Sequence, residues 1–359
     1  MNRLVIIPVL FALASVSAYA QAGSSAESSA FETRYAVQVI DDATFYANLR
    51  EPLPATLNQV LLEPSFSMHY LDRLSFSTSL IGVAATYSDT STQLRVKETY
   101  GGLSAGDFDF TAGRKMLRWG TGYAFTAAGV LDPPRNPTDP SDRLNLNEGR
   151  DMIKTDWVHG PHAISAAWST AALAPSQSNL HDTTAFRYNV LVRGFDTSLI
   201  AGDDRGADAF GGFTFTRVVG QAWELHGEAM WRQQAAVLAG AKYIFSNITL
   251  VGEFYTPPNT TYYRDPGVSP QAGRQHYMFL SAGKDRLRER PGWKEWGVSG
   301  SLVANLNDRS YTTVVDVNRW FGNHFDAYVH FAAPAGGRNA EYGSAPYSAA
   351  TSAGVSFHL

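Results

Sequence analysis

Apolar and polar residues alternate one by one along many segments of this chain. In residues 186–193, Phe186 and Tyr188 fall on one parity, while Arg187 and Asn189 fall on the other. Neighbouring side chains of a β-strand point to opposite faces, so this pattern predicts a strand with one apolar and one polar face. No segment after the N-terminus shows a convincing helical period. The alternation therefore predicts an all-β chain.

Counting the alternating segments gives about 18 strands, within a range of 14–18. Two of these segments are irregular: Glu98 breaks the alternation of one, and residues 34–41 could instead form a plug. The predicted strands are 34–41, 58–70, 73–87, 91–100, 106–118, 151–159, 162–170, 184–193, 195–203, 208–217, 221–231, 236–245, 247–255, 273–283, 296–305, 309–318, 323–333 and 350–359.

The N-terminus reads as a secretory signal peptide. Arg3 precedes an apolar stretch that ends near Val16, and Ala18-Tyr19-Ala20 is a small-x-small cleavage site. We therefore predict that residues 1–20 are removed, that 21–33 form a flexible segment, and that 34–359 form one domain. The chain has no cysteine, which excludes a lipoprotein anchor, disulfides and thiolate metal sites.

Bulk composition narrows the class of protein further. The net charge is −4, so no polybasic surface favours nucleic acid as a partner. Aromatic residues make up 13% of the chain, and no later apolar run approaches the roughly 18 residues of a spanning helix. Aromatic enrichment without such a helix is typical of a transmembrane β-barrel, whose outer face is apolar and whose lumen is wet.

Connection lengths support a barrel with two different ends. If the N-terminus is periplasmic, every second connection is external, and the long ones all fall there: 42–57, 119–150, 171–183, 256–272 and 334–349. Tight connections such as Gly160-Pro161 and Gly194 fall on the periplasmic side. The charged stretch 284–295 is the one long periplasmic exception, and it is a candidate docking patch for a periplasmic partner.

The last residues carry a more specific signal. Gly354 precedes Val355, Phe357 and Leu359 on one parity. This ending resembles the terminal strand of outer-membrane barrels, although here the final residue is Leu359 where an aromatic is usual. The mature chain resembles a Gram-negative outer-membrane porin-type β-barrel. The resemblance implies a transmembrane antiparallel up-and-down barrel, surrounding outer-membrane lipid, and recognition of Gly354–Leu359 by the barrel insertion machinery.

Parity also predicts which charged strand residues face the lumen, and the long connection 119–150 with the basic cluster before it adds candidates for a constriction. Parity turns seven basic and eight acidic strand residues inward, which is nearly balanced, whereas strongly ion-selective pores use rings of one sign. The candidates are Arg95, Lys97, Asp109, Arg114, Lys115, Arg118, Arg135, Asp139, Asp142, Arg143, Arg150, Arg187, Arg193, Glu224, His226, Glu228, Lys242, Glu253 and Asp316.

The connection 119–150 is the most unusual segment. A long loop without its own secondary structure is usually functional or disordered, and its apolar residues argue against disorder. We predict that it folds into the barrel mouth as a constriction; the alternative is an external flap. Its acidic residues, Asp132, Asp139, Asp142 and Glu148, could bind calcium, but their spacing matches no EF-hand.

The sequence gives only weak evidence for a catalytic site. His162 and Ser165 lie three residues apart and therefore point to opposite faces of a strand. Asp203 and Asp204 diverge for the same reason. Glu224, His226 and Glu228 share one face and form the best cluster, yet a hydrated wall accounts for them as well. We predict no catalytic site and no cofactor or metal.

The sequence thus predicts an outer-membrane pore that lets small polar solutes diffuse through a hydrated lumen narrowed by an inward loop. One alternative is an export or import channel for a polymer or amphiphile, working with a periplasmic partner. A lumenal track of Tyr255, Tyr277 and Tyr328 would favour that channel. An outer-membrane barrel hydrolase is a minor alternative.

Overall fold

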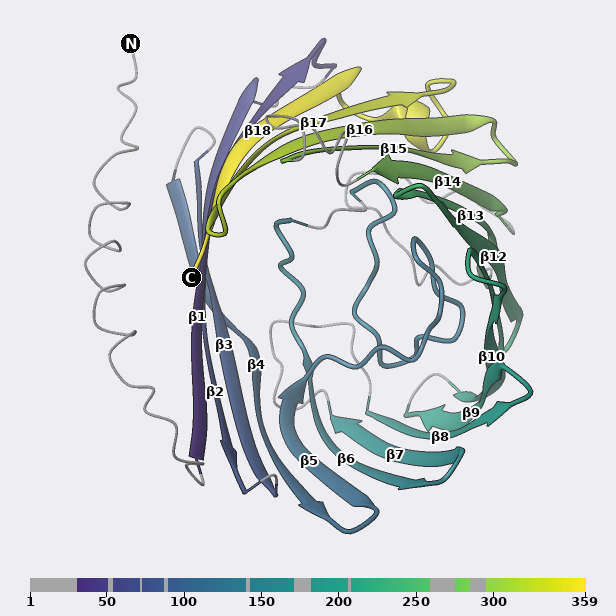
Figure 1. Ribbon diagram of the computed structural model, residues 1–359. Coiled ribbons are helices and arrows are strands. Elements are labelled where there is room, and N and C mark those ends of the chain that lie inside the picture. The colour runs from purple at the N-terminus through teal and green to yellow at the C-terminus, as the bar shows by residue number, and fades with distance from the viewer. Residues whose placement is uncertain are drawn as a thin grey trace.

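Eighteen antiparallel strands form one closed sheet in the computed structural model (Figure 1). It describes residues 31–50, 54–71, 73–86, 90–139, 143–170, 182–205, 208–258, 275–284 and 295–359. Each strand pairs with its neighbours in chain order, and β1 pairs with both β2 and β18. The prediction of an antiparallel up-and-down barrel of 18 strands is confirmed.

The strand bounds follow the alternating segments closely. The elements are β1 (Phe31–Ala47), β2 (Thr56–Tyr70), β3 (Leu74–Thr86), β4 (Thr90–Ala105), β5 (Phe108–Lys115), β6 (Arg150–His159), β7 (His162–Thr170), β8 (Thr183–Val192), β9 (Phe195–Asp204), β10 (Asp208–Val219), β11 (Trp223–Trp231), β12 (Ala235–Phe245), β13 (Ile248–Thr256), β14 (Tyr277–Lys284), β15 (Trp296–Asn305), β16 (Ser310–Phe321), β17 (Phe325–Ala335), the 3₁₀ turn η1 (Tyr342–Ser344) and β18 (Ala349–His358). No helix among the described residues is long and apolar enough to cross a membrane.

Several boundaries differ from the prediction: β4 runs to Ala105 rather than to 100, β14 begins at Tyr277 rather than at 273, and β1 and β5 differ as well. β1 begins at Phe31 and runs to Ala47, so residues 31–33 belong to the wall and 34–41 are not a plug. β5 ends at Lys115 rather than at 118, because the chain leaves the wall there. The predicted signal peptide and residues 21–30 lie outside the described residues.

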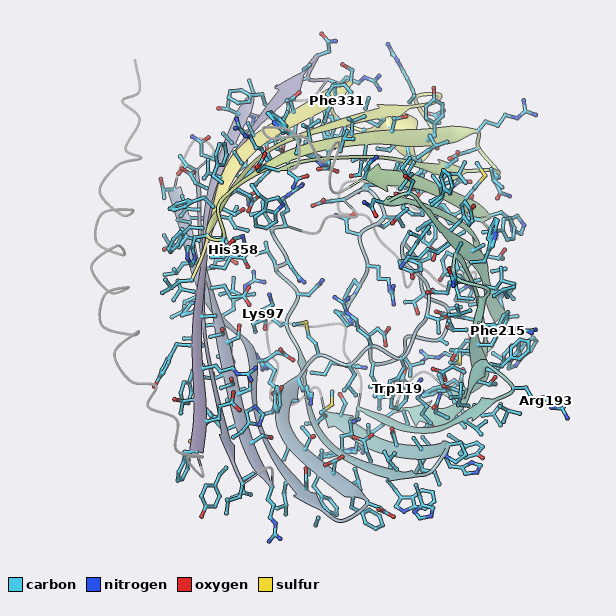
Figure 2. All side chains as sticks on the ribbon, in the orientation of Figure 1. Lys97, Trp119, Arg193, Phe215, Phe331 and His358 are labelled. Atoms are coloured by element: carbon cyan, nitrogen blue, oxygen red, sulfur yellow. The ribbon has the colours of Figure 1, made fainter. Side chains whose placement is uncertain are left out.

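The two faces of the sheet differ as the alternation requires. On β8 and β9, Phe186 and Leu199 point outward with 54% and 57% of their surface exposed, while Ala185 and Ile200 are buried on the inward face. Figure 2 shows Phe215 on the outside of the wall and Lys97 on its inside. The outward face is therefore apolar and the inward face mixed.

A β-bulge explains why Glu98 breaks the alternation. The β3–β4 register shifts at Ser79/Leu80, so that Leu80 faces Val96 while Ser79 faces Glu98. Lys97 is the extra residue, and such an insertion turns two consecutive side chains to the same face. Lys97 forms an ion pair of 2.7 Å with Glu63 on β2, and Glu98 accepts a hydrogen bond from the Met116 amide.

The two ends of the barrel differ in their connections. At the end where β1 begins and β18 ends, which we call the short-turn end, two residues join β8 to β9 and β12 to β13. At the opposite end, the long-loop end, residues 116–149 join β5 to β6 and residues 336–348 join β17 to β18. Residues 285–294, most of the exceptional periplasmic connection, lie outside the described residues.

The β8–β9 turn gives a test of this geometry. Arg193 and Gly194 have φ of 50° and 78°, the left-handed pair of a type I′ turn. A Cβ on Gly194 would meet no atom within 4 Å, so Gly194→Ala should cost about 1 kcal/mol through backbone strain alone. Urea unfolding in lipid vesicles measures this loss. Gly101→Ala is the control, because its Cβ would make only an ordinary 3.8 Å contact, with the Ser75 carbonyl oxygen; equal losses in both variants would contradict the turn assignment.

Candidate functional site

The connection between β5 and β6, residues 116–149, lies inside the ring of strands (Figure 1). We call it the inner loop; its residues 140–142, including the candidate Asp142, lie outside the described part. The polar contacts of its described residues concentrate on three parts of the wall, β11–β13, β16–β17 and β4–β5, and its apolar residues also pack against β8–β9. The structure thus places this segment within the barrel rather than as a flap above it.

Glu228 on β11 is the first anchor of the inner loop. Its side chain is almost fully buried and accepts hydrogen bonds from the amides of Gly122 (2.8 Å), Ala127 (2.6 Å) and Ala128 (2.7 Å). The Thr121 amide and the hydroxyls of Thr121 and Thr126 donate as well. A buried carboxylate needs such donors, because an unpaired charge away from water is costly.

Glu253 on β13 is the second anchor. It accepts hydrogen bonds from the amides of Tyr123, Ala124 (2.9 Å) and Phe125 (3.3 Å), and its Oε1 lies 3.0 Å from His226 Nε2. His226 is on β11, so this last contact crosses β12. Gly240 makes the crossing possible: a Cβ there would lie 2.3 Å from His226 Nε2 and 2.9 Å from Glu253 Cγ.

Asp132 is the third carboxylate that holds the inner loop, and it belongs to the loop itself. Its carboxylate accepts hydrogen bonds from the Trp119 (2.6 Å) and Gly120 (3.0 Å) amides. Together, Asp132, Glu228 and Glu253 accept hydrogen bonds from nine of the ten backbone amides in residues 119–128. Backbone amides are the main donors to these carboxylates, with Arg135 3.7 Å from Asp132 and His226 3.0 Å from Glu253 beside them.

Apolar packing supports the same contact. The Phe125 ring is buried and stacks on Tyr255 of β13 with centroids 5.0 Å apart. Leu131 and Trp119 pack with Ala185 and Ile200 of the β8–β9 wall. Figure 2 shows Trp119 inside the barrel. The inner loop is therefore docked by burial as well as by hydrogen bonds.

The second attachment lies further round the wall, on β16 and β17. Arg143 binds Asp316 on β16 at 2.7 Å, and its guanidinium lies 4.4 Å from the centre of the Tyr328 ring on β17. Asp316 also contacts His330 at 3.0 Å. Leu144 packs against the apolar cluster of Ile40, Leu61 and Ile81 beside it.

The third attachment holds the end of the inner loop. Glu148 is almost buried and pairs with Arg95 (3.4 Å) and Arg114 (3.3 Å), while the Gly149 amide bonds to the Lys97 carbonyl at 2.8 Å. Arg114 also pairs with Asp151 at 2.9 Å. Arg114 is a register partner of outward-facing Thr99, so it ties the loop to the wall and does not line the lumen.

Tyr123 links the loop to two further candidates. Its hydroxyl donates to Glu224 at 2.8 Å and accepts from Lys242 at 3.2 Å. Its ring meets His226 edge-on at 5.3 Å. Glu224, His226 and Glu228 therefore share one face as predicted, but two of the three are covered by the loop.

The remaining candidates fall in different places. Arg187 faces inward and bonds to Ser198, Lys115 lies over the Tyr100 ring, and Asp109 sits at the short-turn start of β5. The prediction that Arg193 faces the lumen is wrong: it lies in the β8–β9 turn and points away from the barrel (Figure 2). Within the inner loop lie Arg118, which is exposed, Arg135, which bonds to the Gly120 carbonyl at 3.0 Å, and Asp139; Arg150, at the start of β6, bonds to the Val130 carbonyl at 2.9 Å.

Several anchoring groups are not among the candidates that strand parity identifies. Glu63, Glu98 and Tyr123 are absent from that set, and Asp132 and Glu148 appear only as calcium ligands. In the structure their oxygens accept from amides or from basic side chains, which is a structural role. His162 and Ser165 are separate: His162 contacts the Tyr188 hydroxyl and Ser165 contacts Asp156.

Comparison with known proteins identifies the fold. No protein-family model and no curated protein sequence matches the chain. Among solved structures, Pseudomonas aeruginosa OccK11 (OpdR) is similar with a TM-score of 0.62 and 9% identity, covering 91% of this chain and 96% of that one. Pseudomonas aeruginosa OccK3 (OpdO) has a TM-score of 0.62, 8% identity and the same coverage. Pseudomonas aeruginosa OprD has a TM-score of 0.61 and 7% identity, covering 91% and 95%. The barrel shares their fold.

Removal of the Glu228 carboxylate should release the inner loop. Glu228→Ala leaves buried amides without acceptors, at about 1–3 kcal/mol each, so the amides of residues 121–128 should exchange with deuterium about tenfold faster or more. Hydrogen-exchange mass spectrometry measures this. Glu224→Ala is the matched control on the same strand, since Glu224 is partly exposed and, among the described residues, it accepts a hydrogen bond from the Tyr123 hydroxyl but from no backbone amide. Unchanged exchange in Glu228→Ala would contradict the anchor.

Asp132 gives the docked loop a pH dependence. Burial raises its pKa from 3.8 to about 6, outweighing the Trp119 and Gly120 amides and Arg135, which favour the charged form. A carboxyl with the higher pKa in the docked state holds its proton more tightly there, so docking strengthens as pH falls through about 6. Protection of the 117–121 amides, corrected for intrinsic exchange, should rise about tenfold from pH 7.5 to 5. Asp132→Asn should abolish the rise; a pH dependence that persists in it would assign the effect to another group.

Proposed function

We propose that this chain is an outer-membrane pore through which small polar solutes diffuse, and that the inner loop narrows its lumen. The observation that carries the proposal is the closed barrel of 18 strands with the loop fixed inside it. Barrels of 16–18 strands leave an aqueous channel. The apolar outward face fits lipid, and the similar solved structures have the same architecture.

Orientation follows from the same features. We place the short-turn end in the periplasm and the long-loop end outside, as in bacterial outer-membrane barrels. β18 then ends at the periplasmic rim, where Gly354–Leu359 fits a role in recognition by the insertion machinery. The predicted signal peptide fits export to that compartment.

The lumenal charges favour weak ion selectivity. Many are paired along a strand, between strands or with the loop: Lys154 with Asp156, Lys97 with Glu63, Arg232 with Asp204, and Arg143 with Asp316. A wall whose charges are paired orients polar solutes through local dipoles. It does not form the ring of one charge sign that an ion-selective filter uses.

The two alternatives find less support. A polymer channel would use a continuous aromatic track, yet Tyr255 lies under Phe125 and Tyr328 lies under Arg143, both largely buried. The candidate docking patch at 284–295 falls mainly outside the described residues. A hydrolase centred on Glu224, His226 and Glu228 is disfavoured because His226 and Glu228 are buried and engaged by the loop.

Replacing the loop tests the pore directly. Lys115 and Arg150 are register partners, so an Asn-Gly turn can replace residues 116–149 without disturbing the wall. Single-channel conductance in a planar bilayer should show open steps for the intact protein and steps several-fold larger for the variant. A heat-modifiability gel confirms that both barrels are folded.

Other conductance results would point to a different cause of narrowing or to a different function. Equal conductance would show that the lumen is narrowed elsewhere. Silence of the intact protein with conductance of the variant would indicate a gated or partnered channel. Silence of both folded barrels would refute the pore.

A further inference from the structure

Cations gather on the outward face of the barrel at its short-turn end. Arg217, two residues before the end of β10, is exposed and is the register partner of Phe195 at the start of β9. Its guanidinium lies 4.4 Å from the centre of the Phe195 ring. Parity puts Arg217 on the same face as Phe213 and Phe215, which is the outside of the wall.

A second arginine, Arg193, precedes Phe195 by two residues in the chain. Arg193 is exposed in the turn that leads into Phe195, and it points away from the barrel (Figure 2). Within the described part of the chain, neither Arg193 nor Arg217 has a carboxylate within ion-pair distance. This contrasts with the inward face, where most cations have acidic partners.

An apolar stripe continues from these cations toward the middle of the wall. Leu199 and Phe213 are register partners on β9 and β10, with 57% and 44% of their surface exposed. Phe215 lies between them and Arg217, and Figure 2 shows it on the outside of the barrel. The surface therefore joins a charged rim to an apolar strip one strand pair wide.

The same rim carries further cations on aromatic rings. Arg319, near the end of β16, lies over Trp296 at 5.3 Å and Phe321 at 4.7 Å. Lys284 ends β14. Among the described residues, the outward register positions at the short-turn ends of β9, β10, β14 and β16 include no Asp or Glu.

We propose that Arg193 and Arg217 bind the phosphate headgroup of an anionic phospholipid, with Phe195 holding the Arg217 guanidinium and the acyl chain lying along Phe215, Phe213 and Leu199. Guanidinium groups match phosphate oxygens in geometry and charge. Basic residues at a membrane interface attract anionic lipid, and aromatic girdles mark that interface in barrels. A soluble phosphate would use the two cations alone, whereas the adjoining apolar stripe fits a lipid. The inference requires that the barrel sits in a membrane, but not that it conducts.

Lipid titration followed by native mass spectrometry tests the site. The full mature chain in neutral detergent is titrated with phosphatidylglycerol or phosphatidylcholine, and bound lipids are counted. Each basic residue near an anionic surface strengthens binding about fivefold, so Arg193→Gln with Arg217→Gln should weaken phosphatidylglycerol binding roughly 25-fold and leave phosphatidylcholine unchanged. Arg309→Gln with Arg338→Gln is the matched control, since both arginines are exposed at the long-loop end.

Further measurements distinguish a lipid site from a site for free phosphate, and loss of the site from misfolding of the variant. Arg193→Lys with Arg217→Lys keeps the charge and should retain most of the binding, which excludes misfolding as the cause. Glycerol 3-phosphate should not displace the lipid; efficient displacement would overturn the lipid assignment. Equal affinity of the intact chain for both lipids, or an equal loss in the long-loop control, would also overturn it. Single-channel conductance should be the same in all these variants, so a failure here leaves the pore proposal untouched.

Discussion

Two buried carboxylates inside the barrel, Glu228 and Glu253, organise the centre of this structure. They are almost inaccessible to solvent, and seven backbone amides of residues 121–128 donate to them. Each partner needs the other: the carboxylates need donors in place of water, and the loop amides need acceptors because they form no sheet. The inner loop therefore stays in the lumen through a reciprocal contact, and the shape of the remaining passage depends on it.

The wall could be predicted from the sequence because its information is local. Alternation along residues such as 186–192 reports which side chain faces outward or toward the lumen, and that determines strand, face and approximate register. Even the irregularity at Glu98 is visible in the sequence, although its meaning is not. A bulge at Lys97 moves both residues inward, and only the pairing with Glu63 and with the Met116 amide shows why.

The loop contacts could not be predicted because they join residues far apart in the chain. Gly122 and Glu228 are 106 positions apart, and nothing in the stretch 119–128 identifies its amides as ligands of a carboxylate. Parity places Glu228, Glu253 and Asp316 correctly on the inner face, but it cannot separate a hydrated wall residue from a buried anchor. Arg193 is misplaced for the opposite reason: strand parity does not extend into a type I′ turn.

The positive charges on the two faces of the barrel have different surroundings. Inside, most cations meet carboxylates of the wall or the loop, as Arg143 meets Asp316 and Arg95 meets Glu148. Outside, Arg217 and Arg319 lie on aromatic rings at the short-turn rim, where the described outward register positions of their strands carry no acidic neighbours. An apolar wall bounded by such a rim matches a membrane whose headgroups supply the missing anions. The paired charges of the inward face fit the proposed passage of polar solutes, and the outward rim fits the proposed lipid site.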